Sequence, residues 1–467
     1  MDIGNIIFAV VFYIFLGYFL VQAIYSIILV LMGFVQVRRR RFEYVHENYD
    51  TFARSFFIVP VTIIVPAHNE EVWIKQSLLS LLNVKYPMFE VIIVNDGSTD
   101  TTMDVLDSIL QLRRMNRVFT NRFDCGKING IFASGKYDNV TVIDKESGYH
   151  KAGALDAGLI FAKYQYILVI DADTILEPDA LFKVMPYIDK NPDENIGIGA
   201  YFGLVNGFKI EDGKILEKRH SYNPIIACQN LEYIRNFIGA RLTWSRYNAI
   251  PCVSGGFGVW RRNMLLEMGG FSSAFSCEDI EITFRAHSYM NKEGKPYRIM
   301  TVPFCVGWTE GPANISSLII QRKRWHRVVI EVVTYYREMF FNKKYKVFGL
   351  VTMPYMVLYE MCGVLFELSS LVFVVIGYFL GVLSIKIFLA YFLLMIILNS
   401  LTGLVAIISY VILERSFSIP YILYLIVLSI LDMIIYRPFL LIAKVKGSIE
   451  FFKGYRAGEQ YKRPKIT

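Results

Sequence analysis

The chain has 467 residues, of which 54% are hydrophobic and only 19% are charged, and its formal net charge is +8. This composition is too apolar for an ordinary soluble protein and indicates a membrane protein. Much of the positive charge flanks apolar segments, and no stretch of the polar region alternates Lys and Arg with aromatic residues, so nucleic acid is not an expected partner. The six cysteines lack CxxC and Cys/His spacing, which argues against a zinc site or a disulfide framework.

Four apolar segments are long enough to cross a lipid bilayer. They cover residues 6–35, 351–380, 387–413 and 419–443. Four arginines, Arg38 to Arg41, follow the first segment, so the positive-inside tendency predicts an outward N-terminus and a cytoplasmic domain after it. Four spans would place the basic C-terminal tail outside, against the same tendency, so the last segment is alternatively interfacial or re-entrant. Within the second segment, Glu360 and Glu367 are seven residues apart, which predicts one shared helix face.

The region after the first apolar segment begins as an α/β domain. Two short runs rich in β-branched residues, 60–65 and 91–94, predict buried strands, and residues 71–82 between them have helical spacing. Such alternation predicts a parallel sheet that binds ligands outside the carboxyl ends of its strands. Glu70 and Asp96 follow these two strands. Asp96 is suited to accept hydrogen bonds from a base or ribose, and equally to cap the next helix.

A third predicted strand, residues 166–170, runs directly into Asp171-Ala172-Asp173. Two carboxylates at such a strand end can converge on Mg²⁺ or Mn²⁺ and its phosphate ligands. Burying them unpaired would be unfavourable, although a simple loop explains the pattern as well. Upstream, Lys151 opens a predicted helix rich in small residues, where an anionic group can approach, unless the lysine is merely solvated.

Two later segments carry further polar groups. Glu278-Asp279 precedes a helical run, so a carboxylate here is a candidate general base, although acidic residues also favour helix starts. Gln321, Arg324 and Trp325 lie in a basic pentapeptide shortly before the second apolar segment. Trp offers a flat apolar face to a sugar ring and Arg a fixed fork of donors to a phosphate or a carboxylate. Alone, the pentapeptide is more typical of an interfacial membrane anchor.

The order and spacing of these motifs resemble those of the membrane-embedded family 2 glycosyltransferases, which include cellulose, hyaluronan, chitin-oligosaccharide and poly-N-acetylglucosamine synthases. The resemblance covers residues 60–330 by motif and the flanking segments by architecture. It implies a cytosolic GT-A domain, an α/β Rossmann-like fold with a mostly parallel sheet, docked on an α-helical transmembrane bundle by interfacial amphipathic helices. The expected organisation is a transmembrane helix with its basic flank (1–41), the GT-A domain (42–317), interfacial helices (318–350), transmembrane or interfacial segments (351–443) and a basic amphipathic tail (444–467).

The resemblance also implies roles for individual residues. Those implied to bind the nucleotide donor are Ala67, Glu70, Asp96, Lys151 and Asp171. The metal would be held by Asp171 and Asp173. The implied catalytic carboxylates are Asp279, as general base, and Glu278. The residues implied to contact the acceptor and the diphosphate are Gln321, Arg324 and Trp325. Two positions depart from the family pattern, Cys277 for the usual Thr and Asp156 for the usual Asn. Neither removes a catalytic group, and both leave the sugar open.

The function that the resemblance implies is a processive, inverting β-glycosyltransferase of the plasma or inner membrane. It would polymerise UDP-glucose or UDP-N-acetylglucosamine into an extracellular polysaccharide and translocate it, with Mg²⁺ or Mn²⁺ as cofactor. Its partners would be the UDP-sugar, the growing polysaccharide, the lipid bilayer and accessory export proteins. One alternative is a non-processive membrane enzyme that makes a lipid-linked sugar, against which the Gln-x-x-Arg-Trp motif argues. The other is a transporter or scaffold whose domain only binds nucleotide-sugar.

Overall fold

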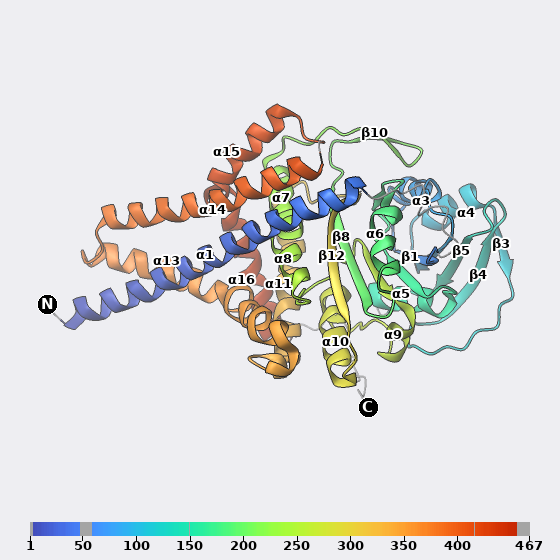
Figure 1. Cartoon of the computed structure of the whole chain (residues 1–467), viewed down its shortest axis with the longest axis horizontal. Coiled ribbons are helices and arrows are strands. Elements are labelled where there is room, and N and C mark those ends of the chain that lie inside the picture. The colour runs from blue at the N-terminus through green and yellow to red at the C-terminus, as the bar shows by residue number, and fades with distance from the viewer. Residues whose placement is uncertain (1–2, 47–57, 149, 415, 455–467) are drawn as a thin grey trace.

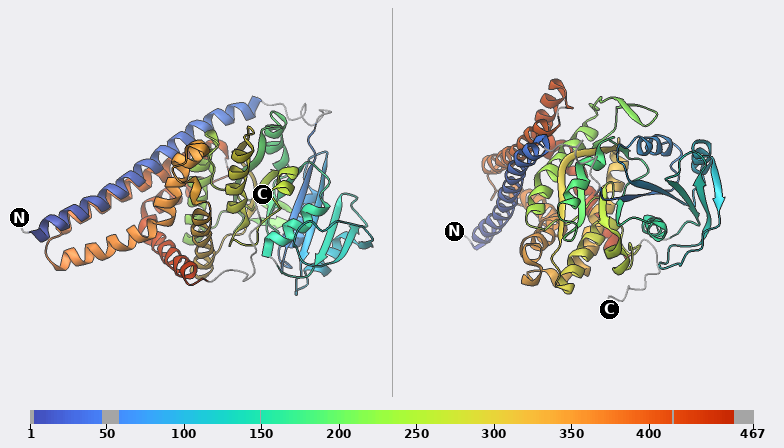
Figure 2. Two further views of the ribbon diagram at one scale, coloured as in Figure 1. Left: turned by 90° about the horizontal axis from the view of Figure 1, so that it is seen from below. Right: turned by 45° about the vertical axis from the view of Figure 1, so that its right-hand side comes forward.

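The computed structural model describes residues 3–46, 58–148, 150–414 and 416–454. The expected basic tail therefore lies outside the described residues from 455 onward, as do residues 47–57 of the expected GT-A domain. The described chain has an α/β part built around a ten-stranded sheet and a helical part from which α1, α13 and α14 project to one side (Figure 1). Figure 2 shows the same projection from below.

The sheet is mixed and mostly parallel: besides its four central parallel strands, β8 and β12 also pair in parallel. Its order is β3-β4-β5-β2-β1-β6-β11-β8-β12-β7, in which β5, β2, β1 and β6 run parallel and β11 is antiparallel to both of its neighbours. The strands are β1 (Val61–Ala67), β2 (Phe89–Asp96), β3 (Leu112–Met115), β4 (Ile128–Ser134), β5 (Val140–Lys145), β6 (Tyr166–Val169), β7 (Ile175–Leu176), β8 (Asn195–Leu204), β11 (Gly258–Arg261) and β12 (Arg298–Thr309), with a separate hairpin of β9 (Lys209–Glu211) and β10 (Lys214–Glu217). The three parallel strands predicted from sequence are confirmed. The ends of β1, β2 and β6 all lie within about two residues of the predicted ends.

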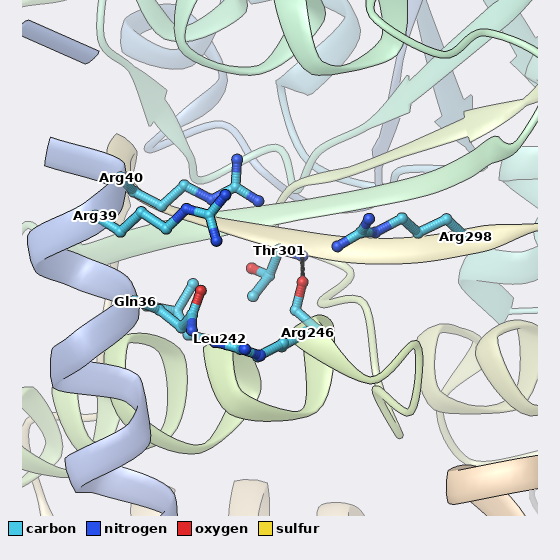
Figure 3. Close-up of a pocket in the computed structure, with 8 residues that line it drawn as sticks. Gln36, Arg39, Arg40, Leu242, Arg246, Arg298 and Thr301 are labelled. Atoms are coloured by element: carbon cyan, nitrogen blue, oxygen red, sulfur yellow. Dashed lines mark hydrogen bonds between the residues drawn. The ribbon is translucent and has the colours of Figure 1, made fainter. Parts of the chain in front are cut away.

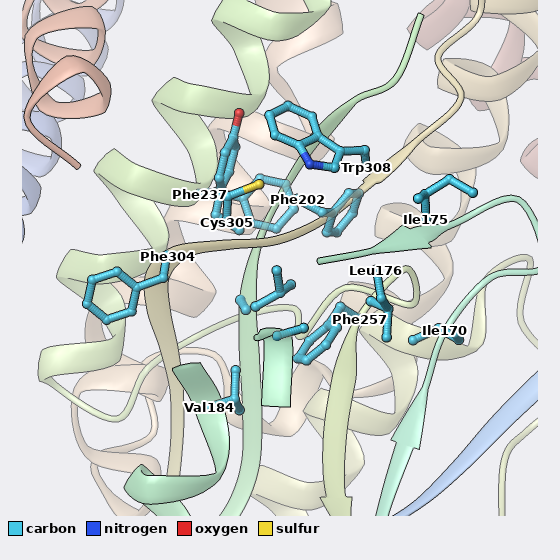
Figure 4. Packing of buried hydrophobic residues seen from close by; sticks show 14 of the residues in the cluster. Ile170, Ile175, Leu176, Val184, Phe202, Phe237, Phe257, Phe304, Cys305 and Trp308 are labelled. Carbon is cyan, nitrogen blue, oxygen red and sulfur yellow. The ribbon is translucent and has the colours of Figure 1, made fainter. Parts of the chain in front are cut away.

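Helices cover both faces of the sheet. One face carries α3 (Ile74–Leu82), α4 (Thr102–Leu110), α6 (Ala180–Asp189) and α7 (Pro224–Ile234), and the other carries α5 (His150–Phe161), α9 (Arg262–Glu267) and α10 (Glu278–Glu293). Side chains of β1 alternate between the two faces, so Ile63 and Val65 join one core and Ile64 the other. A Cβ on Gly158 of α5 would lie 2.5 Å from the Ile64 side chain, so only glycine allows this close packing. Figure 4 shows part of the first core.

The remaining helices link the sheet to the apolar part. They are α1 (Ile3–His46), η1 (Arg235–Arg241), α8 (Leu242–Arg246), α11 (Ile315–Tyr335), η2 (Arg337–Met339), η3 (Lys343–Tyr345), η4 (Phe348–Thr352), α12 (Met353–Tyr355), η5 (Met356–Met361), α13 (Gly363–Phe379), α14 (Ile385–Leu413), α15 (Ile419–Ile435) and α16 (Arg437–Phe452). Of these, α11 lies along α16, where a Cβ on Gly447 would be 2.7 Å from the Lys323 carbonyl oxygen. Lys323 also forms an ion pair with Glu450 at 2.5 Å.

Two described helices are long and apolar enough to cross a membrane, Ile6–Arg41 and Ile385–Leu413. Two further pairs qualify if each counts as one span: Phe348–Met361 with Gly363–Phe379, bent by 43°, and Ile419–Ile435 with Arg437–Phe452, bent by 46°. A proline at the start of α16 lies at the second bend. It explains the bend, because proline cannot continue the preceding helix. These helices support a membrane location.

The shared helix face expected for Glu360 and Glu367 is wrong. Glu360 belongs to the π-helix η5, which ends at Met361, whereas Glu367 belongs to α13 beyond the 43° bend. Glu360 accepts a hydrogen bond from Tyr355 at 3.1 Å, and Glu367 lies 3.7 Å from the Lys444 ammonium. The helical periodicity behind the prediction does not continue across a break in the helix.

Candidate active site

The carboxyl ends of β1 and β2 lie side by side, as expected, because Ala67 is in register with Asn95. Asp96 ends β2 and is buried, and its carboxylate forms an ion pair with Lys145, which ends β5. Sequence reasoning missed Lys145; the only signal was a charged residue at the end of a strand that begins with β-branched residues. The alternative role of Asp96 as a helix cap is not what the structure shows, since Asp100 accepts the hydrogen bond from the Thr102 N–H at the start of α4.

The loops after β1 and β2 hold each other in place through side-chain and backbone hydrogen bonds. The Thr99 N–H donates to Asn69 Oδ1 at 2.8 Å, and the Glu70 N–H donates to Thr102 Oγ1 at 2.9 Å. Gly97 has φ +62°, and a Cβ there would lie 2.5 Å from the Ser147 N atom, so the turn requires glycine. Burial and the nearby carboxylates raise the pKa of Glu70 to about 7. The two loops therefore form a fixed, acidic edge.

Asp171 and Asp173 follow β6 at this same edge. Asp173 accepts a hydrogen bond from Thr309 Oγ1 at 3.1 Å. Burial, followed by the charges of Asp171 and Glu70, raises the pKa of Asp173 to about 7, which means that negative charge accumulates here. A hard divalent cation bound by carboxylate oxygens would relieve that repulsion, so these residues fit Mg²⁺ or Mn²⁺. Among the described residues no three His, Cys, Asp or Glu side chains converge as a metal site, so phosphate and water oxygens would complete the coordination.

Lys151 brings two of the predicted motifs together. It is the second residue of α5, and its Nζ lies 2.5 Å from Asp171 Oδ1 and 2.8 Å from Glu278 Oε1. Burial alone would lower the pKa of Lys151, but these two carboxylates raise it. Conversely, burial alone would raise the pKa of Glu278, but Lys151 lowers it. One cation thus joins the Asp-x-Asp turn to the Glu-Asp pair at the start of α10.

Asp279 has a different environment from that of its neighbour Glu278. Its Oδ2 accepts a hydrogen bond from the Gly255 N–H at 2.9 Å, and its Oδ1 accepts one from the Ile280 N–H at 2.7 Å. Burial, followed by the charge of Glu278, raises the pKa of Asp279. A Cβ on Gly255 would lie 2.9 Å from Lys151 Nζ, so the glycine allows this close approach. The two neighbouring carboxyl groups therefore have different roles. The lowered pKa keeps Glu278 ionised, and the raised pKa makes Asp279 the candidate proton acceptor.

The Gln-x-x-Arg-Trp segment lies on α11. Arg324 is exposed, and after Lys151 its charge also lowers the pKa of Glu278. The guanidinium of Arg322 lies 4.0 Å from the centre of the Trp325 ring and also forms an ion pair with Glu232 at 2.8 Å. Sequence reasoning gave Arg322 no role, although its position three residues before Trp325 on a helix predicts contact.

The predicted site residues thus fall into one cluster and several separate positions. Asp171, Lys151 and Glu278 are joined directly, Asp173 and Asp279 follow two of these residues closely in the chain, and Arg324 acts on Glu278 through its charge. In the part of the chain that the structure describes, no side-chain hydrogen bond or ion pair links Ala67, Asp96, Gln321 or Trp325 to this cluster. Gln321 Oε1 is nevertheless buried without a hydrogen-bond partner among the described residues, which suits a group that a ligand completes.

Comparison with known proteins places the chain in a family. Residues 166–430 match the model described as glycosyl transferase family group 2, and residues 62–268 match glycosyl transferase family 2. The chain belongs to the family 2 glycosyltransferases, which confirms the family and the class of enzyme expected from its motifs.

Two relatives are poly-beta-1,6-N-acetyl-D-glucosamine synthases. The chain is 26% identical to that of Staphylococcus epidermidis over 265 residues, which are 57% of this chain and 53% of the relative. It is 26% identical to that of Staphylococcus aureus (strain COL) over 290 residues, which are 62% of this chain and 59% of the relative. The chain thus spans somewhat more than half the length of the curated relatives it matches.

A solved structure confirms the fold. The mannosyltransferase PcManGT from Pyrobaculum calidifontis, in complex with GDP-Man and Mn²⁺, aligns with a TM-score of 0.52, covering 94% of this chain and 99% of that one. Because the two sequences are only 14% identical, the likeness concerns the fold alone. The expected α/β GT-A fold is therefore confirmed.

Proposed function

We propose that the chain is a processive, inverting β-glycosyltransferase that polymerises a UDP-sugar at the cytoplasmic face of a membrane. The observation that carries this proposal is Lys151, which holds Asp171 of the Asp-x-Asp turn and Glu278 of the Glu-Asp pair in one site. The residues proposed to bind the donor diphosphate therefore lie next to Asp279, which is proposed to activate the acceptor hydroxyl. The names of the two synthases similar to this chain support N-acetylglucosamine as the sugar, with glucose as the other candidate.

The proposed reaction follows from the positions of the carboxylates. Asp279 removes the proton from the acceptor hydroxyl, the freed oxygen forms a bond to C1 of the sugar, and the bond from C1 to UDP breaks with inversion. Glu278 stays ionised and holds Lys151 beside the leaving diphosphate. Asp171 and Asp173 would hold a divalent cation, which when bound neutralises charge on the departing diphosphate.

Processivity is supported by the helix that carries Gln321 and Trp325. The side chain of Trp325 is fixed by Arg322, and fixed aromatic rings are suitable platforms for sugar rings. Because α11 also packs along α16 of the apolar part, the acceptor would leave the site toward the membrane helices. The four arginines Arg38 to Arg41 after the first apolar helix support a cytoplasmic catalytic domain, by the positive-inside tendency.

The test is turnover by the purified full-length chain with radiolabelled UDP-N-acetylglucosamine or UDP-glucose and Mg²⁺ or Mn²⁺. We expect released UDP and a long polymer from one of the two donors, and formation of both at least about a hundredfold slower in the Asp279→Asn variant. A lipid-linked monosaccharide would instead support the non-processive alternative. Binding of nucleotide-sugar without any turnover would contradict the proposal and support a transporter or scaffold.

A further inference from the structure

Helix α11 joins the apolar part of the molecule to the segment that precedes the Glu-Asp pair. Its first half carries the Gln-x-x-Arg-Trp segment and lies along α16, where His326 and Ser448 form a hydrogen bond of 3.0 Å. Its second half contacts the α/β part through Glu331. One helix therefore contacts both the apolar helices and the segment that leads to the proposed catalytic carboxylates.

Glu331 binds Ser276 with both oxygens of its carboxylate. Its Oε2 accepts a hydrogen bond from the Ser276 N–H at 2.8 Å, and its Oε1 accepts one from the Ser276 hydroxyl at 2.9 Å. Oε1 also accepts from Arg327 Nε at 2.7 Å, in an ion pair along α11 whose two side chains are only 10% and 13% exposed. Because both oxygens have donors, the carboxylate is fixed in one orientation.

This contact lies immediately before the helix that carries the proposed general base. Ser276 is two residues before Glu278 and three before Asp279, which occupy the first turn of α10. The start of a helix usually gains a hydrogen bond from the side chain of its N-cap residue. The N-cap residue here is Cys277, whose side chain makes no such bond. The bond from Glu331 therefore fixes this helix start from outside, where its own cap does not.

A second contact joins α10 to α11 one turn further along. The hydroxyl of Tyr336, which follows the last residue of α11, donates to Glu281 Oε1 at 2.7 Å. Glu281 Oε2 forms an ion pair with Arg285 at 2.8 Å. Since Glu281 follows Glu278 by three residues, the contacts of Ser276 and Glu281 with α11 flank the turn that carries the two carboxylates.

We propose that Glu331 is a positioning residue for the reaction. By holding Ser276, it fixes the start of α10 relative to α11, so that Asp279 keeps its place relative to an acceptor that α11 binds. The proposal rests on the function proposed above, which makes Asp279 the general base and α11 the acceptor helix. A general base must lie within hydrogen-bond distance of the proton that it removes, so a small displacement of α10 lowers the rate and leaves donor binding intact.

The test is Glu331→Gln in the full-length chain, assayed for UDP release and polymer formation over a range of UDP-sugar concentrations. An amide has one oxygen and one NH₂ group, so in either orientation its NH₂ group meets a donor and part of the contact is lost. We expect kcat to fall at least about tenfold, because small displacements of a catalytic group are costly. The KM for the UDP-sugar should change less than about twofold, because the donor site is untouched.

The matched control is Glu90→Gln at the start of β2. The Glu90 side chain is 12% exposed and also accepts from one hydroxyl, Thr62 Oγ1 at 2.6 Å, and from one backbone N–H, that of Lys163 at 2.9 Å. It lies six residues before Asp96, which is roughly 20 Å along a strand. This variant should show a similar fall in the thermal unfolding midpoint but keep the wild-type kcat. An equal loss of kcat in Glu90→Gln would overturn the positioning role.

Ser276 variants test the same contact if Glu331→Gln does not fold. Ser276→Ala removes the hydroxyl and keeps the N–H, so kcat should fall several-fold, and Ser276→Thr should restore it because threonine keeps the hydroxyl. The control for alanine is Ser245→Ala, which should keep the wild-type kcat. Ser245 Oγ accepts from the Thr301 N–H at 3.0 Å and joins α8 to β12 at residues outside the cluster (Figure 3).

The Asp279→Asn variant separates failure of the positioning role from failure of the proposed function. If Asp279→Asn is slow while Glu331→Gln and Ser276→Ala keep the wild-type kcat, the positioning role is overturned and the proposed function stands. If Asp279→Asn itself keeps the wild-type kcat, the proposed function fails, and the positioning role fails with it.

Discussion

Replacing Asp279 by Asn removes the proposed general base and leaves the size of the side chain almost unchanged. Asp279 accepts one hydrogen bond at each oxygen, from the Gly255 and Ile280 N–H groups. An Asn side chain has a single oxygen, so one of these donors would lose its partner. That loss costs about 1–3 kcal/mol of unfolding free energy. Loss of a general base lowers the rate by a further factor of roughly 10²–10⁴, independently of folding.

The assay must separate these two effects. UDP release and polymer formation are measured on equal amounts of folded, membrane-inserted protein, together with the affinity for UDP and the thermal unfolding midpoint. We expect a rate at least about a hundredfold lower. We expect little change in UDP affinity, because Asp279 makes its hydrogen bonds to backbone groups rather than to the Asp-x-Asp turn.

The matched control is Thr283→Val, one turn further along α10. Thr283 Oγ1 donates to the Asp279 carbonyl oxygen at 2.8 Å and accepts from the Val253 N–H at 3.0 Å. Valine therefore leaves a buried N–H unpaired, with a similar loss of stability of about 1–3 kcal/mol, but it keeps the Asp279 carboxylate. Asp279→Asn transferring sugar within a few-fold of wild type would refute the reasoning, and so would an equal loss of rate in Thr283→Val.

Three further predictions concern the metal, the acceptor and pH. Asp173→Asn should lose the gain in UDP affinity that Mg²⁺ or Mn²⁺ produces, and a retained metal-linked gain in titrations would make the Asp-x-Asp turn merely structural. Trp325→Ala should release UDP but make only short products, whereas Trp325→Phe should partly restore chain length because it keeps an aromatic platform; normal-length polymer from Trp325→Ala would leave this residue as a membrane anchor. Burial and neighbouring carboxylates raise the pKa of Glu70 and Asp173 to about 7, above the usual value of about 4. Folded protein therefore holds these protons more tightly than unfolded protein does, so the stability of metal-free protein should fall as pH rises from about 4 to 7. Denaturation measured at several pH values should show a smaller fall in stability for Asp173→Asn.

Much of the site edge was predictable from local sequence. The apolar runs before Ala67, Asp96 and Asp171 are buried parallel strands, and hydrogen-bonded register brings the carboxyl ends of such strands to one edge. Asp171 and Asp173 were found because a carboxylate pair directly after an apolar run is unusual in a buried position. The helix expected from residue 71 begins only at Ile74, because the preceding residues form the loop that contacts the Asp96 segment.

The pairing of charges was not predictable, because it joins residues far apart in the chain. Asp96 meets Lys145 across 49 positions, and Lys151 reaches Glu278 only because α5 and α10 pack on the same face of the sheet. Such contacts depend on how the helices are placed over the strands.

Sequence and tertiary structure determined different features of this protein. The sequence by itself determined the parallel strands, the order of the motifs, the family and the apolar segments, because these depend on side-chain periodicity and on short local patterns. Tertiary structure alone decided that Glu278 stays ionised while the pKa of Asp279 rises, and that Glu360 and Glu367 are separated by a bend. The physical reason is that burial and Coulomb interactions depend on distance in space, and spacing along the chain reports that distance only within a single unbroken element.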